Sequence, residues 1–528
     1  MASIWESIGS LFSRRSRSGE RALQMPSWMA SFTSYPFSSG GNTRGGYTAG
    51  KATRLTEDWR PGEVGPNRAH QMDGQLLRER AWDLYHNNPY AGSAVDAYIS
   101  NVIECGIVPE FDGDSREAEW RRWCGVSAHA TRDCDLSRDQ TFYELQQLVL
   151  TEVIVGGGCL VHFVDVPRRS QRVPLAIELI GENRFATELQ MSGPNKKTAN
   201  PVRNGIEIDS ATGRSVAYHV RKAQPNDLEF DPLETIRLPC EQCEYVYVKG
   251  RIGAKRGTSL LKNSIMWLWA LGYYTDNELA ASDLKSSWAY IIRTTSGVDG
   301  YGGLAGESES QLTDVNGNPI DRHEPGMIWR GDEADDIVGV GPNVPGGDSL
   351  PWITMIQRSI AIGVRLSYED VFRDYSKVSF SAVRIARGQD KKRYRPLQFF
   401  MIHHFCNPTI KRFSRAAVGA MLPGFPRPSE FAGGIEDEWL DAQHWQTPGW
   451  ESPNPKDDAL AHHQMLEDRT ISRTEIAASQ GRNWRRSAEL LGRENEVMSD
   501  AGVAPSSPVE PQQSPVDEPS DEDKENAE

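Results

Sequence analysis

The chain has 528 residues, more than one small core needs, and at roughly 100–200 residues per domain it predicts about two to four domains. Its net charge of −15 argues against simple wrapping of nucleic acid, which requires a basic surface. Seven scattered cysteines indicate reduced thiols rather than a disulfide framework. No run of about 18 uninterrupted apolar residues is present, so we expect no membrane-spanning helix and no membrane anchor.

The N-terminal region, residues 1–73, is rich in Gly, Ser and Arg and predicts a partly flexible arm with little core of its own. Residues 4–12 could form a short amphipathic helix, which favours a docking arm over a membrane anchor. The start lacks the apolar run and cleavage site of a signal peptide. From about residue 74 the pattern is helical, with a break before Pro89 and a second helix that Gly106 would end.

Residues 107–250 mix short helices with strands. The stretch "FYELQQLVLTEVIVGGGCLVHFVDV" predicts a helix, a glycine turn and a strand. Further on, Ile206–Ile208 and Val216–Val220 have strand composition, and Ser210–Gly213 between them predicts a hairpin turn. We therefore expect an α+β fold.

The stretch "KGRIGAKRGTS" (Lys249–Ser259) combines glycines, basic residues and Thr-Ser ahead of an apolar helix. It fails as a nucleotide-binding P-loop, because Gly257 is followed by Thr258 where that motif needs lysine. The alternative is a flexible lead-in, with Thr258 or Ser259 capping a long helix. That helix is predicted from Ser259 to about Ser286, a length of about 40 Å.

The C-terminal half is predicted to be largely helical after the strand-like "WAYIIRTT" and a region rich in Gly, Asp and Asn. From residue 501 the chain is rich in proline and acidic residues and predicts a disordered tail. We expect helices at Pro351–Leu366, Ser381–Met421 with interruptions near Pro396 and Pro408, Lys456–Asp468 and Ser472–Leu491.

No pattern in the sequence predicts a catalytic residue, a metal site or a cofactor. Cys240 and Cys243 have one half of a zinc spacing, and no second half follows at finger-like distance. An acidic loop offers carboxylates that could hold a divalent ion, although their pattern favours a solvated acidic loop. Its members are Asp332, Glu333, Asp335 and Asp336.

Charge placement is more informative. Residues 381–420 hold nine Lys or Arg residues and one acid, Asp390. Two interpretations stay open: a basic zone near DNA phosphates, or a helix face that is solvated or contacts acidic neighbours in an oligomer. The densest cluster is Lys391, Lys392, Arg393 and Arg395.

Several stretches together resemble the lambda-type portal proteins of tailed bacteriophages. They include "NNPYAGSAVDAYISNVIECGIVPE", "RGTSLLKNSIMWLWALGYYTDNELAASDLKSSWAYII" and "GVRLSYEDVFRDYSKVSFSAVRIA". The resemblance covers roughly residues 70–495, and its specificity lies in the order and spacing of these stretches. It implies a ring, usually of twelve subunits, around a DNA channel at one capsid vertex.

The resemblance also implies a portal fold with a mixed α/β wing, a long-helix stem, a small α/β clip and a helical C-terminal region. Its implied divisions are the arm (1–73), wing (74–257), stem helix (258–287), clip (288–347), returning stem helix (348–367), channel loop (368–380), long wing helix region (381–424), C-terminal wing or crown helices (425–500) and acidic tail (501–528).

Two sets of residues gain expected roles from this resemblance. The channel loop would place Arg373 and Lys377 near DNA, or else in intersubunit pairs with Asp370 or Asp374. The full channel set is Arg373, Asp374, Tyr375, Ser376 and Lys377. Aromatic residues of the stem would pack against adjacent helices, or else in the core of the single chain: Trp267, Trp269, Tyr273 and Tyr274.

The implied partners are further copies of this chain, double-stranded DNA, the terminase large subunit, the major capsid and scaffold proteins, and head-completion or connector proteins. Such a protein would be assembled in the host cytoplasm and end in the virion. Twelve copies would carry a charge on the order of −180, which suits DNA that must slide. The competing interpretations are a metal- or nucleotide-dependent DNA-processing enzyme and another head-assembly protein.

Overall fold

The computed structural model of the protein divides into two compact units, Met1–Gly65 and Pro66–Glu528. Every helix and strand discussed below belongs to the second unit. The structure describes residues 62–111, 113–127, 130–167, 171–190, 200–225, 231, 234–287, 290–293, 328–331, 349–376, 378–431, 444–450, 454–482 and 484–501.

Two consecutive helices open the second unit, α2 (Pro66–Asn87) and α3 (Pro89–Val102). The predicted break before Pro89 is confirmed, and Asn88 caps α3 by accepting hydrogen bonds from the next two free backbone N–H groups. The start of α2 corrects the sequence interpretation, because the helix begins at Pro66 rather than near residue 74. Proline suits a first helical turn, where its missing N–H costs nothing.

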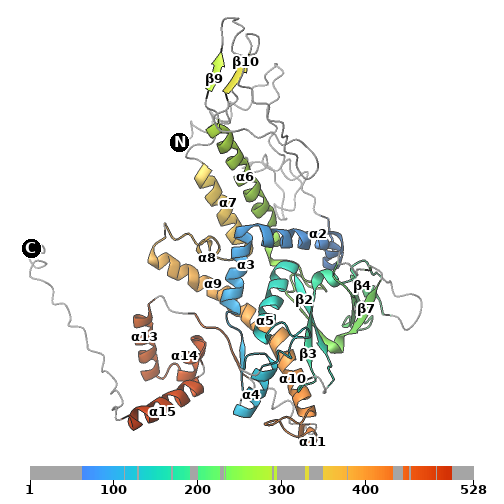
Figure 1. The fold of residues 1–528 in the computed structure, drawn as a ribbon, viewed down its shortest axis with the longest axis vertical. Coiled ribbons are helices and arrows are strands. Elements are labelled where there is room, and N and C mark those ends of the chain that lie inside the picture. The colour runs from blue at the N-terminus through green and yellow to red at the C-terminus, as the bar shows by residue number, and fades with distance from the viewer. Residues whose placement is uncertain are drawn as a thin grey trace, which may run out of the picture. The chain divides into compact units, whose positions relative to one another are not determined.

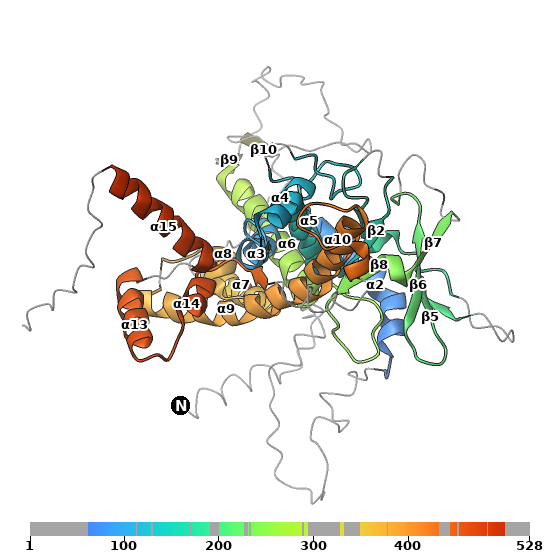
Figure 2. The same ribbon diagram turned by 90° about the horizontal axis from the view of Figure 1, so that it is seen from below.

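The strands in the described residues form two antiparallel sheets and two small pairs. One sheet has the order β3-β2-β8, and the other has the order β4-β5-β6-β7, whose strands β5–β7 lie next to one another in Figure 2. The predicted hairpin is confirmed as β5 and β6. The bounds are β1 Val108–Glu110, β2 Gly158–Val164, β3 Ala176–Gly181, β4 Val202–Arg203, β5 Ile206–Ile208, β6 Ser215–Arg221, β7 Thr235–Pro239, β8 Cys243–Tyr247, β9 Tyr290–Arg293, β10 Ile328–Gly331 and β11 His444–Gln446.

The predicted helix, glycine turn and strand are also confirmed. Helix α5 (Phe142–Thr151) starts with a reciprocal cap between Thr141 and Glu144. It widens into a π turn over Glu152–Gly156 and then enters β2. The short helix α4 (Asp114–Trp123) precedes it.

The main apolar core joins helices α2, α3, α5, α7 and α9 with the face of β2 and β3. Aromatic rings fill its centre, and Trp120 contacts Phe142 and Phe413 with ring centroids 5.1 and 4.9 Å apart. A second, smaller cluster lies between the two sheets, around Phe185 and Tyr245. The strands thus carry apolar residues on both sides.

The long helix α6 (Ile265–Ser287) lies beside α7 (Ser349–Val364), as Figure 1 shows. Ser264, just before α6, donates its hydroxyl to the carbonyl of Ile360 near the end of α7 at 2.9 Å, so the two helices run in opposite directions. The predicted start at Ser259 is wrong in detail. Ser259 caps a short 3₁₀ turn (Leu260–Asn263), and the α-helix begins only after it.

After α7 come α8 (Tyr368–Phe372), α9 (Phe380–Met401), a π turn (Ile402–Cys406), α10 (Asn407–Gly419) and the single turn α11 (Pro428–Glu430). The interruption predicted near Pro396 is wrong, because α9 continues through it. Pro396 and Lys392, whose carbonyl loses its helical donor, are both exposed, so solvent can hydrate that carbonyl.

Three helices end the described chain: α13 (Pro455–Glu467), α14 (Arg473–Ser479) and α15 (Trp484–Asp500). The prediction of one continuous helix over Ser472–Leu491 is wrong. Gly481 has a φ of +70°, a left-handed conformation that ends α14. Within the described ranges, no helix is both long and apolar enough to span a bilayer.

The stretch Lys249–Ser259 is firmly anchored rather than flexible, because it carries a buried ion pair. The guanidinium of Arg256 donates to the carboxylate of Glu182 at 2.6 Å, and neither side chain is exposed. A second donation goes to the carbonyl of Asn204 at 2.7 Å. Tyr245 donates its hydroxyl to the other carboxylate oxygen at 2.9 Å.

The same stretch passes so close to the turn before β2 that only glycines fit. A Cβ on Gly257 would overlap the carbonyl oxygen of Gly157. The backbone N–H of Gly257 donates to the Tyr245 hydroxyl at 3.2 Å, and Ser259 donates to the carbonyl of Ile154 at 3.0 Å. The glycines that imitate a phosphate loop therefore serve chain packing.

The buried cluster perturbs its titratable members. Burial would lower the pKa of Arg256, but the Glu182 carboxylate outweighs it and raises that pKa. Burial, together with Arg256 and Arg78, lowers the pKa of His70 to about 3. His70 is therefore neutral at pH 7 although it lies 3.9 Å from Glu182. Burial raises the pKa of Glu152 to about 7.

We expect Arg256→Met to destabilise the protein by about 3–5 kcal/mol, because it leaves the Glu182 carboxylate buried without its cation. The midpoint of urea denaturation at pH 7 measures this. Lys249→Met, an exposed position in the same stretch, is the control and should leave the midpoint unchanged. Equal midpoints for the two variants would show that the pair does not anchor the fold.

We expect Glu152→Gln to stabilise the protein more at pH 8 than at pH 4.5. The folded-state pKa of Glu152 is raised, so its favourable contribution is complete below about pH 4.5 and is lost as pH rises through about 7. Glutamine keeps the oxygen that accepts from the backbone of Glu182. The difference in stability should grow by about 3 kcal/mol over this range. A difference that is flat with pH contradicts the assignment.

Candidate functional site

The segment that joins α7 to α9 is built from a short helix and a tight turn. Ser367 caps α8 by accepting from the backbone N–H of Asp370, and Arg373 ends it in a left-handed conformation with φ of 53°. Asp374 then accepts from the backbone and hydroxyl of Ser376 at 3.0 and 2.6 Å. These local bonds give the turn a defined shape without a strand or sheet.

Both flanks of this segment are fixed to the core. Ser93 of α3 donates to the carbonyl of Val371 at 2.7 Å, and the hydroxyl of Tyr394 on α9 donates to Asp370. Asp390, also on α9, accepts from the backbone of Ser367 at 2.9 Å. Burial raises the pKa of Asp390. The single acid in the basic run of residues 381–420 therefore has a structural role.

The tip of the segment faces solvent. Of the five residues predicted for this site, Arg373, Tyr375 and Ser376 are exposed, and Asp374 is half-buried. Lys377 lies outside the described residues. Asp370 and Asp374 are already engaged within the chain, by Tyr394 and Ser376.

The predicted basic cluster on α9 does not form one patch. The guanidinium of Arg393 lies 3.5 Å from the hydroxyl of Tyr98 and faces the core side of the helix. Lys392 is exposed on another face. Lys391 and Arg395, one turn apart, both approach the ring of Trp450, at 5.7 and 5.9 Å. Helical geometry separates the neighbours in sequence and pairs residues four apart.

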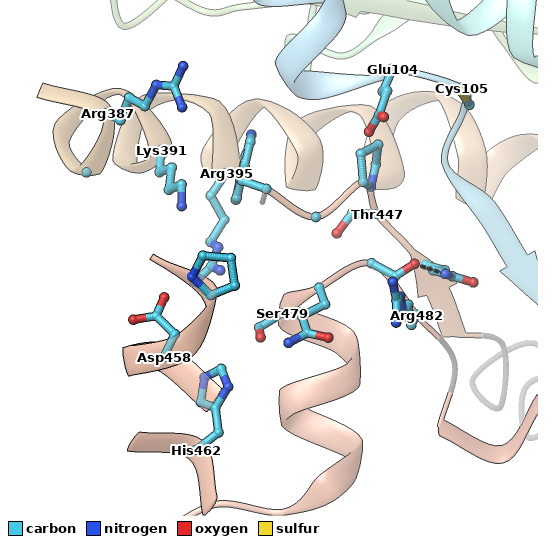
Figure 3. A pocket seen from close by; sticks show the side chains of 18 of the residues that line it. Glu104, Cys105, Arg387, Lys391, Arg395, Thr447, Asp458, His462, Ser479 and Arg482 are labelled. Atoms are coloured by element: carbon cyan, nitrogen blue, oxygen red, sulfur yellow. Dashed lines mark hydrogen bonds between the residues drawn. The ribbon is translucent and has the colours of Figure 1, made fainter. Parts of the chain in front are cut away.

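Lys391 and Arg395 belong to a longer basic stripe that lines a groove of about 1100 Å³. Arg384 and Arg387 extend the stripe by two turns, and Arg384 pairs with Asp458 of α13 at 3.4 Å. Figure 3 shows the groove between α9 and the helices that carry Asp458, His462 and Ser479. Burial lowers the pKa of Lys391, while Asp458 opposes that shift.

The four aromatic residues predicted for α6 also separate. Trp267 packs against the main core, whereas Trp269 and Tyr273 are 58% and 60% exposed and stack on each other 5.6 Å apart. Tyr274 is half-buried. On the neighbouring helix α7, further large apolar side chains face solvent: Trp352, Met355 and Ile362.

In the described part of the chain, no three His, Cys, Asp or Glu side chains gather as a metal site would require. The cysteines of the half zinc spacing have other surroundings: Cys243 is buried in the second core cluster, and Cys240 donates to the Tyr218 hydroxyl at 3.7 Å. The acidic loop Asp332–Asp336 lies outside the described residues.

Comparison with known proteins decides between the classes of function. The family model described as phage portal protein, lambda family, matches residues 52–398, which is more than half of the chain. This chain belongs to the lambda family of phage portal proteins. The match includes α2 through most of α9, and so it contains the long helices α6 and α7 of this portal protein, the segment after α7 and the basic stripe.

Individual relatives are more distant. The chain is 23% identical over 455 residues to a probable portal protein of Halomonas phage phiHAP-1, covering 82% of this portal protein and 83% of that one. Two solved structures, described as the neck of a native GTA particle computed with C12 symmetry and the virion of a native gene transfer agent particle, contain chains that are similar at 13% identity. For both, 78% of this portal protein and 93% of the other chain are covered, with TM-scores of 0.34 and 0.32.

Sequence reasoning missed two features of this portal protein. Arg384 and Arg387 were not included with Lys391 and Arg395, although their spacing of three and four residues places all four on one helix face. The exposed apolar face of α7 was also missed. Its sequence, "SLPWITMIQRSIAIGV", is apolar almost all round, which is typical of a helix with partners on more than one side.

Proposed function

We propose that this portal protein assembles with further copies of itself into a closed ring of twelve subunits around an axial channel. The observation that carries the proposal is the exposed apolar face of α6 and α7. Trp269, Tyr273 and Ile362 are each more than half exposed in the single chain. Burying one such side chain contributes about 1.5–3 kcal/mol, so a neighbouring subunit is the natural cover.

In this assembly α6 is the stem helix and α7 the helix that returns alongside it. Residues 74–257 form the wing and residues 288–347 the clip, with the long wing helix region (381–424), the C-terminal wing or crown helices (425–500) and the tail (501–528) following. The antiparallel packing of α6 and α7 supports the stem assignment, because the chain leaves and re-enters the described body at neighbouring points.

The segment 368–380 is the part of each subunit nearest the DNA. Its flanks are held by Ser93 and Asp390 while Arg373 and Tyr375 are exposed at the tip. A rigidly supported tip can touch a moving duplex without unfolding. The tip carries few cations, and the chain as a whole is acidic. Its contacts with DNA phosphates are therefore weak and salt-dependent, which allows the duplex to slide.

The ring sits at one vertex of the capsid in the virion, seeds head assembly in the host cytoplasm and is the passage for genome packaging and ejection. Its other partners are the terminase large subunit, the major capsid and scaffold proteins, and head-completion or connector proteins. Energy from nucleotide hydrolysis belongs to terminase, which agrees with the packing role of the glycines around Gly257. No observation among the described residues favours the enzyme alternative.

Native mass spectrometry of the full-length protein, with negative-stain images of the same sample, tests the ring. We expect closed rings of twelve for the wild type and loss of rings for Trp269→Glu with Tyr273→Glu, because charge on the apolar face opposes its burial. Ile252→Glu, which alters a 94% exposed apolar residue in a loop, is the control and should leave rings intact. Wild-type monomers at micromolar concentration, or rings in the double variant, contradict the proposal.

The channel assignment predicts that Arg373→Ala with Lys377→Ala keeps the ring but reduces the DNA packaged or retained several-fold. The reason is the loss of phosphate contacts at the tip, and the deficit should shrink as salt rises. A packaging reaction with purified heads and terminase measures it. Lys456→Ala, an exposed position on α13, is the matched control. Unchanged packaging in the double variant removes the proposed DNA contact.

A further inference from the structure

The groove between α9 and the C-terminal helices is a basic site on an acidic chain. Among the described residues, five Lys or Arg side chains line it against two carboxylates, Glu104 and Asp458, a formal net charge of +3 if histidine is left out of the count. The basic members are Arg384, Arg387, Lys391, Arg395 and Arg482. Against a chain charge of −15, such a concentration of positive charge attracts an anionic partner.

Within this groove the cations are held in position rather than freely solvated. Lys391 and Arg395 both lie over the ring of Trp450, which restricts them and keeps their charged ends together. Among the described residues, neither has a carboxylate within salt-bridge distance. Figure 3 shows Lys391 directed toward the side of the groove where Asp458 and His462 lie.

The size of the groove favours a peptide over a duplex. Its volume of about 1100 Å³ is close to the upper end of the roughly 300–1000 Å³ typical of pockets that enclose small ligands. A few residues of extended chain fill such a space. Double-stranded DNA would contact only its rim.

An acidic peptide of suitable reach is part of this chain. Residues 502–528, outside the described ranges, contain eight Asp or Glu residues and one Lys, a net charge of −7. Arg482 of the groove lies two residues before α15, and α15 has 17 residues, so the helix ends about 25 Å further on. The first eight residues of the tail, 502–509, carry no charge and can span about 26 Å when extended. The first acid, Glu510, can therefore return to the groove.

We propose that the acidic segment 510–528 binds in the groove of its own chain, where its carboxylates meet Lys391 and Arg395. The tail neutralises the stripe and keeps DNA off this face of the protein. Because the tail is tethered, its effective concentration is on the order of millimolar, and it outcompetes weak external anions. This proposal is independent of ring formation and of the channel contacts at Arg373.

A direct test uses a fluorescent synthetic peptide of residues 502–528 and two full-length proteins. One is the wild type, and the other is a tail-neutral variant with the eight acids of 510–528 changed to Asn or Gln. We expect the peptide to bind the tail-neutral variant about tenfold more tightly than the wild type, because the wild-type tail already fills the groove. Fluorescence anisotropy at 50 mM NaCl measures both affinities. Equal affinities overturn the proposal.

Groove variants in the tail-neutral protein locate the binding. Lys391→Glu with Arg395→Glu should abolish measurable binding, whereas Lys392→Glu, an exposed charge reversal on another face of α9, should change the affinity less than twofold. If Lys392→Glu weakens binding as much as the double variant, the interaction is non-specific and the proposal fails. Circular dichroism of each variant confirms that α9 remains helical.

A third experiment distinguishes an acidic peptide from DNA as the occupant of the groove. A labelled 20-bp duplex should bind the tail-neutral variant more tightly than the wild type, and unlabelled peptide should displace the excess. A duplex that binds both proteins equally, at Lys391 and Arg395 and without displacement by peptide, identifies the groove as a DNA site and overturns the tail assignment. Hydrogen exchange at residues 446–450 gives a label-free readout, with greater protection expected in the wild type.

Discussion

The Arg256–Glu182 ion pair is the contact that ties the start of α6 to both sheets. Its partners come from the lead-in to α6, the turn after β3, and the residues next to β4 and on β8. A buried pair contributes to stability only if its remaining donors and acceptors are satisfied, and here backbone carbonyls and a tyrosine hydroxyl do so. The pair therefore specifies where α6 begins relative to both sheets.

Two exposed surfaces follow from that fixed point. Helix α6 leaves the body with Trp267 packed inward and Trp269 and Tyr273 outward, so one helix supplies both a part of the core and the exposed face for which we propose a role in assembly. The segment after α7 is then positioned by bonds to α3 and α9, which present Arg373 and Tyr375 to solvent. Hydrogen bonds hold the flanks of this segment, while Arg373 at its tip is exposed.

Local patterns in the sequence were sufficient for most elements. The break before Pro89, the hairpin of β5 and β6 and the turn into β2 were all predicted, because each is specified by neighbouring residues. Pro396 and Gly481 show the limits. Whether a proline interrupts a helix depends on whether it lies on the exposed face of that helix. Whether a glycine ends a helix depends on the φ angle that the glycine adopts. Composition alone reveals neither the exposed face nor the φ angle.

Longer-range relations were harder to predict. Nothing in "KGRIGAKRGTS" indicates that Arg256 would meet a carboxylate 74 residues earlier, and the stretch was assigned as flexible. The α9 cluster was chosen by adjacency, which grouped Lys392 with residues on other faces. The family resemblance, in contrast, rested on ordered stretches, and the match over residues 52–398 confirms it.

The anchoring of α6 has a mechanical consequence. A guanidinium held by a carboxylate and carbonyls from several directions is a stiff joint, whereas a glycine-rich linker would be a hinge. In the proposed channel, a translocating duplex would apply an axial load to α6. Arg256 would transmit this load into both sheets with little local deformation. Helix α6 and the two sheets would then move together as one rigid unit within the chain.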